Sequence, residues 1–442
     1  MRVLVSESAL AAWQPTRANP WNRSAAAHLI RRGGFGPQPG DLERALDEGL
    51  ERTIERLSEA PDAHAENVNG IHSLLGVGKL AHLQAWWMSL ITEGGIPLQE
   101  RSALMWHNHF ATSNDKVDDV RMMHAQNAIL REHGLGDFRV LLRKLAKDPA
   151  MLVWLDGNAN KRGNPNENFA REVMELFALG IGNYDEHDIQ EAARAFTGWG
   201  TLGRAFAFSP DHHDRGEKRI FGRRGSFNGD EAIELVLEHP ACPEHVARRL
   251  LTCFVSESPE PTDVQELAAI LVERDWNIGA TLDVLLRSEL FFRSEHRRGR
   301  IAGPVELVAL TARALGRAIS PTRLSLAAER MGQSLFRPPS VKGWDGGRSW
   351  INAGTWLARH NELASTVIDK SGKPRAKLNE TFASASNRRE PSARVLWALF
   401  PDGVEAPFAK LMREAADGCS SEQEALARVA ALALSAPEYH LV

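Results

Sequence analysis

Apolar residues recur at the spacing of one helical face through most of this chain. Between residues 41 and 60, one stripe of apolar side chains faces a row of charged ones; the stripe is Leu42, Leu46, Leu50, Ile54 and Leu57. Such spacing buries one face of a helix. The pattern returns over residues 22–32, 79–92, 97–113, 118–132, 137–147, 230–237, 243–254, 262–275, 278–287, 304–315, 321–331 and 393–435. We therefore predict an all-α protein with a large, multi-helix globular fold, in which residues 1–442 form a single domain.

One segment alternates as a strand does. Residues 205–208 read Ala-Phe-Ala-Phe, a turn-like stretch follows over residues 210–216, and residues 218–221 can return beside the first run. We predict one short β-hairpin-like insertion near residues 204–222.

Charge and cysteine content exclude several classes of protein. The formal net charge is −4, so no basic excess indicates a nucleic-acid partner. The three cysteines form no C-x-x-C pair, which argues against a disulfide scaffold and a thiolate zinc site. Glu7 interrupts what would be the apolar part of a signal peptide, and no apolar run of about 18 residues occurs. We expect a cytoplasmic protein without a membrane span.

The stretch from residue 158 to residue 199 is the centre of a motif-bearing core over residues 94–230. An asparagine-rich loop there leads through Pro165 into a helix that we expect to end at Gly180. Its apolar arc holds Phe169, Val173, Met174, Leu176 and Phe177, and its polar arc holds Glu167, Asn168, Arg171, Glu172 and Glu175. We predict catalytic roles for Arg171, Glu172 and Glu175. The alternative is a solvated ladder of ion pairs.

The asparagines that precede this helix predict a binding loop. Asn158, Asn160, Asn164, Asn166 and Asn168 lie close together in the sequence, and side-chain amides offer both donors and acceptors. We predict that Asn166 and Asn168 bind substrate at a helix N-terminus, while the alternative is an elaborate helix cap.

Two histidines lie on a helix that is apolar on most sides. His107 and His109 are two residues apart, so they point in nearly opposite directions. A buried imidazole requires a hydrogen-bond partner. Both histidines are candidate metal ligands, and the alternative is that each is a core histidine bonded to a backbone carbonyl.

The most concentrated set of potential metal ligands is Asp211-His212-His213-Asp214. Oxygen and imidazole ligands suit Zn, Mn, Fe or Mg, so we predict that His213 and Asp214 bind a divalent metal or act in acid–base catalysis. An exposed polar turn is the alternative.

A loop rich in glycine and tryptophan follows the later helices. It runs from residue 336 to residue 352, and we predict that Trp344, Asp345 and Arg348 bind substrate, because long loops of this kind often carry function. Residues 365–392 are polar, and we predict a mobile segment there.

Six strings of this sequence resemble the bacterial family of domains of unknown function numbered 1800. They are WHNHFATS (106–113), DPAMLVWLDG (148–157), PNENFAREVMELFALGIGNY (165–184), EAARAFTGW (191–199), FSPDHHDRGEK (208–218) and PPSVKGWDGGRSWIN (338–352). With the helices between them the resemblance covers nearly the whole chain. It implies one fold throughout and transfers no reaction.

These residues predict an enzyme. It would use a divalent metal, or carboxylates and histidine as acid and base, for hydrolysis or group transfer on a polar, anionic or polyhydroxylated substrate. The alternative is a non-catalytic helical protein whose Trp- and Asn-rich surface binds a protein or a glycan.

Overall fold

The protein is described by a computed structural model covering residues 8–316, 319–375, 378–385 and 388–442. Helices dominate it and only two small two-stranded sheets occur in this part of the chain, so the predicted all-α class is confirmed. Residues 1–7, which include the Glu7 used to argue against a signal peptide, lie outside the description.

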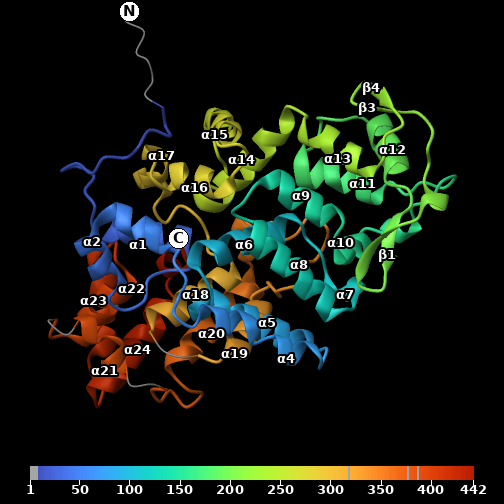
Figure 1. The fold of residues 1–442 in the computed structure, drawn as a ribbon. Coiled ribbons are helices and arrows are strands. Elements are labelled where there is room, and N and C mark those ends of the chain that lie inside the picture. The colour runs from blue at the N-terminus through green and yellow to red at the C-terminus, as the bar shows by residue number, and fades with distance from the viewer. Residues whose placement is uncertain (1–7, 317–318, 376–377, 386–387) are drawn as a thin grey trace, which may run out of the picture.

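The first half of the chain begins with α1 and α2 beside the C-terminal helices, continues through the central helices and reaches the opposite end at α12 (Figure 1). Its helices are α1 (Arg23–Gly33), α2 (Asp41–Arg56), α3 (His64–Asn69), α4 (His72–Leu75), α5 (Leu80–Ser89), α6 (Pro97–His109), α7 (Asn114–Val117), α8 (Val120–His133), α9 (Phe138–Ala146), α10 (Pro149–Trp154), α11 (Asn168–Glu172) and α12 (Glu186–Ala195). The strands β1 (Trp199–Leu202), β2 (Ala205–Phe208), β3 (Lys218–Ile220) and β4 (Arg223–Gly225) follow.

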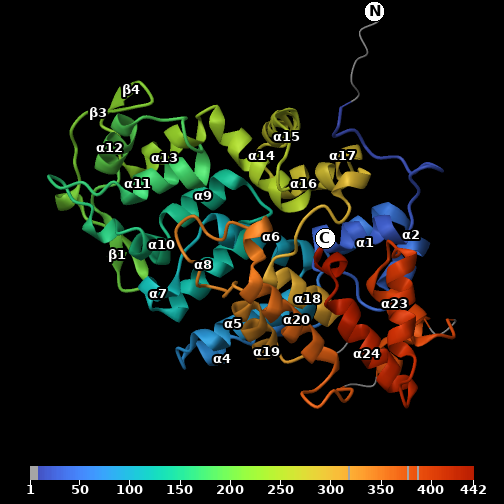
Figure 2. The same cartoon turned by 180° about the vertical axis from the view of Figure 1, so that it is seen from behind.

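The second half packs beside these helices and returns to the end that holds α1 and α2 (Figure 1). Its helices are α13 (Gly229–Leu237), α14 (Ala241–Phe254), α15 (Pro261–Glu273), α16 (Ile278–Leu286), α17 (Glu289–Phe292), α18 (Pro304–Ala314), α19 (Pro321–Arg330), α20 (Ala353–Val367), α21 (Leu378–Thr381), α22 (Pro391–Leu399), α23 (Ala406–Ala416) and α24 (Glu422–Leu434). Both views place α12 and the hairpins at one end and α21–α24 at the other, with α6 between them (Figure 2).

Side-chain caps explain where several helices begin. A capping box begins α12, because the Asp185 side chain accepts from the Asp188 amide and the Asp188 side chain accepts from the Asp185 amide. Asp148 caps α10 in a similar way by accepting from the Met151 amide. These contacts satisfy amide donors that a helix start leaves unpaired.

The central helix differs from the prediction at its start. α11 begins at Asn168 rather than beside Pro165, and it continues as a π-helix over Val173–Ala178. The Asn166 side chain instead accepts a hydrogen bond from the Asn168 amide, which forms a turn before the helix. The helix ends at Ala178, and the predicted stop residue Gly180 follows two positions later with a left-handed φ of 79°.

Two of the four strands of the described chain, β2 and β3, lie where strands were predicted, but the predicted pairing between them was wrong. β2 pairs with β1, and β3 pairs with β4, so residues 205–208 and 218–220 belong to separate antiparallel hairpins. Each strand has a partner only a few residues away, and a short local turn closes a hairpin at lower entropic cost than a long loop does.

One hydrophobic cluster extends through the described chain from Leu10 to Val442. Trp87, Trp106 and Phe110 are each fully buried in it, next to the motif of α6. Burial of a large apolar side chain contributes about 1.5–3 kcal/mol. This packing fixes α6, which carries the residues that position the site.

The segment over residues 365–392 is partly helical. It includes the end of α20, all of α21 and the start of α22, and Leu378 and Phe382 are fully buried. Its residues 376–377 and 386–387 lie outside the description, and its mobility stays a prediction.

The helices of the described residues are all too short or too polar for a bilayer crossing.

Candidate functional site

The loop after α19 is held in place by the histidine-containing end of α6. Phe336 donates its amide to His107 Nε2 at 3.1 Å, and Asn108 Oδ1 accepts from the Trp344 amide at 2.7 Å. Asn108 Nδ2 also donates to the Trp344 carbonyl at 3.2 Å. A Cβ at Gly343, where φ is +80°, would lie 2.2 Å from Asn108 Oδ1. The motifs at 106–113 and 338–352 therefore meet, and only glycine fits at their contact.

A cavity of about 350 Å³ lies between this loop, α6, α14 and the start of α18. Its charged lining consists of Arg101, Arg249, Glu257, Arg300, Glu306, Asp345 and Arg348. Three residues predicted to bind substrate, Trp344, Asp345 and Arg348, are thus brought together in one concave site.

Two arginines of the cavity share one carboxylate. Arg101 and Arg300 both form ion pairs with the same oxygen, Oε1 of Glu306. The other oxygen of Glu306 accepts the Gly303 amide at 2.8 Å. Burial first, and then the charges of Arg101 and Arg32, hold the pKa of Arg300 well below its ordinary value. Arg101 and Arg300 carry two positive charges and Glu306 carries one negative charge, so one positive charge of this cluster has no carboxylate partner.

Arg249 lines the same cavity from α14 and has no hydrogen-bond acceptor among the described residues. Its Nε is fully buried and unpartnered. Burial lowers the pKa of this guanidinium. An unsatisfied buried donor costs about 1–3 kcal/mol, and more when it is charged. Such a residue is expected where a ligand supplies the missing acceptor.

Arg32 adds further positive charge near this cluster. It is 0% exposed, and its one hydrogen bond goes to the His296 carbonyl, at 3.0 Å. Within the described ranges no carboxylate pairs with it, and its Nε and Nη1 have no acceptor. Burial and then the charge of Arg101 lower the pKa of Arg32 to about 9. The interior beside the cavity is therefore electropositive.

Glu257 is an exposed carboxylate of the cavity that forms no ion pair with a described cation. Its Oε1 accepts the Ile301 amide at 3.1 Å. Its Oε2 approaches the loop so closely that a Cβ at Gly347 would lie 2.6 Å from it. Asp345 differs, because Lys342 pairs with it at 2.6 Å.

The two histidines of α6 have protein partners of their own. His109 donates through Nε2 to the Phe177 carbonyl at 2.9 Å, whereas His107 accepts the backbone amide of the loop. Burial lowers the pKa of His107 to about 3 and that of His109 well below its ordinary value, so both are neutral at pH 7. They point to opposite sides, as predicted, and neither lines the cavity.

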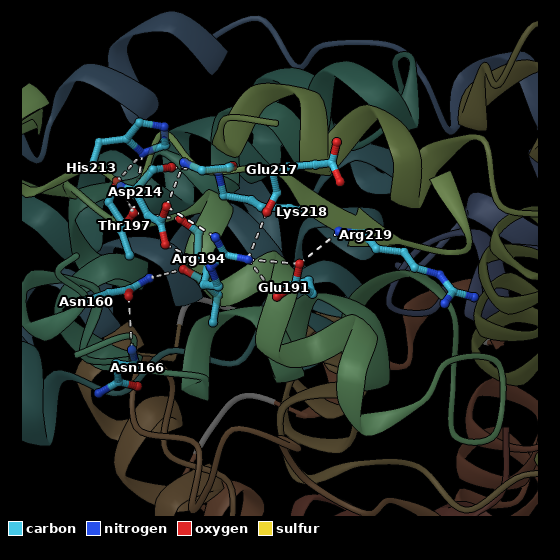
Figure 3. Close-up of polar contacts among 12 residues, drawn as sticks. Asn160, Asn166, Glu191, Arg194, Thr197, His213, Asp214, Glu217, Lys218 and Arg219 are labelled. Carbon is cyan, nitrogen blue, oxygen red and sulfur yellow. Dashed lines mark hydrogen bonds and ion pairs between the residues drawn. The ribbon is translucent and has the colours of Figure 1, made fainter. Parts of the chain in front are cut away.

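His213 and Asp214 belong to a separate network beside the hairpins (Figure 3). Arg194 donates to both oxygens of Asp214, at 2.8 and 3.3 Å, and also holds Glu191 at 2.8 Å. The Arg194 guanidinium is the main reason that the pKa of Asp214 is lowered. A carboxylate held so firmly is a weak general base. The turn is partly buried and bonded rather than freely exposed.

The imidazole of His213 turns away from Asp214. It is buried and donates through Nδ1 to the Thr197 carbonyl at 2.9 Å, while Thr197 Oγ1 accepts the Asp214 amide at 2.8 Å. No group of three or more His, Cys, Asp or Glu side chains in the described part of the chain is placed to hold a metal. The metal set predicted from His107, His109, His213 and Asp214 is therefore not assembled, because these side chains bond to backbone and to Arg194.

The acidic face of the central helix forms a third group. Burial, and then the charge of Glu175, raises the pKa of Glu172 to about 6. Tyr184 donates to Glu175 at 2.9 Å, and Arg171 forms ion pairs with Glu167 and Glu186. None of these residues lines the cavity.

The predicted asparagines act within their own loop. The backbone amide of Asn166 donates to Asn160 Oδ1 at 3.0 Å, and the side-chain oxygen of Asn166 accepts from the backbone amide of Asn168. Asn160 also donates to the Ala193 carbonyl at 2.9 Å. Both asparagines lie outside the lining of the cavity, and the contacts match the alternative of a structured turn.

Five of the charged residues that line the cavity were not predicted from the sequence. They are Arg101, Arg249, Arg300, Glu257 and Glu306. One signal was available: Arg101 lies four residues before Met105 on a helix that is apolar on most sides, and a charged residue on a buried face requires compensation. The other four residues lie far from it in the sequence, and only the fold brings them to it.

A family model with the description "Protein of unknown function (DUF1800)" matches residues 28–441. The match confirms the resemblance predicted from the six strings, and it includes every residue that lines the cavity. No curated protein and no solved structure matches the chain.

Proposed function

We propose that this chain, which belongs to the DUF1800 family, is an enzyme that binds an anionic substrate in the cavity between α6, α14 and the 336–352 loop. The reaction is hydrolysis or group transfer, and Glu257 is its general base. Arg249, Arg300 and Arg348 bind the anionic part of the substrate.

One observation carries this proposal: the guanidinium of Arg249 lies in a cavity and has no acceptor among the described residues. A planar guanidinium offers five donors that match a carboxylate or a phosphate. An anionic ligand supplies those acceptors, and the cavity offers space for it.

Glu257 is the carboxylate best suited to act as a base. Glu306 is held by two arginines and Asp345 by Lys342, whereas Oε2 of Glu257 accepts no hydrogen bond within the described residues. A carboxylate close to bound substrate contributes about 10²–10⁴-fold to proton-transfer steps.

The test is hydrolysis of two chromogenic esters that carry an anionic group, p-nitrophenyl hydrogen succinate and p-nitrophenyl phosphate. We expect Glu257→Gln to lower kcat on the hydrolysed ester by about 10²-fold or more, with the fold retained. Glu260→Gln is the matched control, since Glu260 is exposed three residues away and does not line the cavity.

An unchanged kcat in Glu257→Gln would contradict the catalytic role of this residue. If neither ester is hydrolysed while anions still bind, the result contradicts the proposed hydrolysis of such esters and favours a non-catalytic binding role for the cavity. The metal-dependent form of the enzyme and the cytoplasmic location stay predictions.

A further inference from the structure

We propose that the anionic group bound in this cavity is doubly charged and of the phosphate class. This inference rests on the proposed function, because it concerns the ligand of the same cavity. It adds the charge and the shape of the group that Arg249, Arg300 and Arg348 bind.

The first reason is the charge that the lining leaves unneutralised. Four guanidinium groups face the cavity: Arg101, Arg249, Arg300 and Arg348. Two carboxylates, Glu257 and Glu306, oppose them, and the third, Asp345, is neutralised by Lys342. The excess is two positive charges on the lining, and the buried Arg32 lies close to the same arginines. A single negative charge leaves this excess half compensated, whereas a dianion removes it.

The second reason is the number of donors that lack acceptors. Among the described residues, no side-chain nitrogen of Arg249 or of the exposed Arg348 has a hydrogen-bond acceptor. Gln333, which is 6% exposed, uses its Oε1 to accept the Val305 amide, so its remaining side-chain group in the cavity is a donor. A tetrahedral oxyanion with several acceptor oxygens satisfies more of these donors than a planar carboxylate does.

The mutual repulsion of the buried arginines also favours a doubly charged ligand. Burial is the main cause that lowers the pKa of Arg300, and the charges of Arg101 and Arg32 lower that pKa further. Charges held close together in a medium of low polarity raise the energy of the empty site. A bound dianion reverses that repulsion, so its binding should also stabilise the fold.

The experiment is isothermal titration calorimetry of the full chain with sodium sulfate, phenyl phosphate and sodium acetate at constant ionic strength. Sulfate keeps two charges between about pH 5 and about pH 8, whereas a phosphate monoester gains its second charge near pH 6. The other charged groups that face the cavity, Glu257, Glu306, Asp345 and the arginines, are the same in both titrations. The ratio of the two affinities therefore reports mainly on the second charge of the phosphate. We therefore expect the affinity for phenyl phosphate, relative to sulfate, to rise about tenfold across this range.

We also expect sulfate to bind at least about tenfold more tightly than acetate, and Arg249→Gln to weaken sulfate binding about tenfold. Arg248→Gln is the matched control, because Arg248 is the adjacent exposed residue of α14 and lies outside the cavity. If Arg249→Gln fails to fold, Arg348→Gln on the exposed loop takes its place, with the same expected loss.

Acetate that binds as tightly as sulfate would overturn the dianion inference and leave the proposed anion site standing. An affinity for phenyl phosphate, relative to that for sulfate, that does not change with pH would also contradict the dianion inference. If no anion binds, yet Glu257-dependent hydrolysis of the succinate ester is seen, the inference fails and the catalytic role of Glu257 survives. If neither anion binding nor Glu257-dependent hydrolysis is seen, the proposed function is wrong as well.

Discussion

Asp148 caps α10 with a carboxyl group that is only 1% exposed. Its Oδ2 accepts from Gln126 and from the Met151 amide, and its Oδ1 is buried without a partner. Burial raises the pKa of this group from 3.8 to about 7. The folded chain therefore binds the proton more tightly than the unfolded chain. The stability contributed by the proton is fully present below about pH 4 and is lost as the pH rises to about 7.

Asp148→Asn should remove this pH dependence. The wild-type free energy of unfolding should fall between about pH 4 and about pH 7 relative to that of the variant, with a slope of up to about 1.4 kcal/mol per pH unit. Urea unfolding at a series of pH values measures the difference. Parallel curves for the two proteins would show that the Asp148 carboxyl group titrates normally in the folded state.

At the scale of the element, the position of the 336–352 loop depends on one close contact with α6. Gly343 and Gly346 have nearly the same backbone strain, with φ of 80° and 77°, but only a Cβ at Gly343 would strike Asn108. Gly343→Ala should therefore lower the free energy of unfolding by about 1–3 kcal/mol more than Gly346→Ala does. Gly343→Ala should also weaken sulfate binding. Equal stabilities would mean that the loop moves away from α6 without cost.

The stability of the hairpin region depends on the ion pair between Arg194 and Asp214. Asp214→Asn removes the charge from a forked ion pair and should lower the free energy of unfolding by about 1–3 kcal/mol. Asp211→Asn is the control, since Asp211 is exposed in the same turn and should have little effect. Neither variant should change sulfate affinity, because neither residue lines the cavity. A loss of binding in Asp214→Asn alone would connect the two regions.

At the scale of the whole molecule, the helices could be predicted because apolar spacing is a local property, as the stripe from Leu42 to Leu57 shows. The capping box at Asp185 is equally local. The hairpin pairing was wrong because residues 199–202 and 223–225 were not predicted as strands, so the local partners of β2 and β3 were missed.

The site was predicted only in part. The 336–352 loop was predicted from its composition, but its partners Arg249 and Arg300 lie about 50–100 positions away from Arg348 in the sequence and carry no local motif. His213 and Asp214 attracted a metal prediction because adjacent ligand types look alike whether they bind a metal or, as here, Thr197 and Arg194. Charge compensation is a property of the folded molecule, and it could not be read from the chain alone.

The central claim is that the arginine-lined cavity binds an anion, and anomalous diffraction tests it directly. Crystals of the full chain soaked in sodium selenate, a dianion of the sulfate class, should show a selenium peak inside the cavity. Its oxygens should lie within hydrogen-bond distance, about 2.7–3.2 Å, of the guanidinium of Arg249. Selenium peaks confined to the outer surface, with an accessible cavity left without one, would contradict the account.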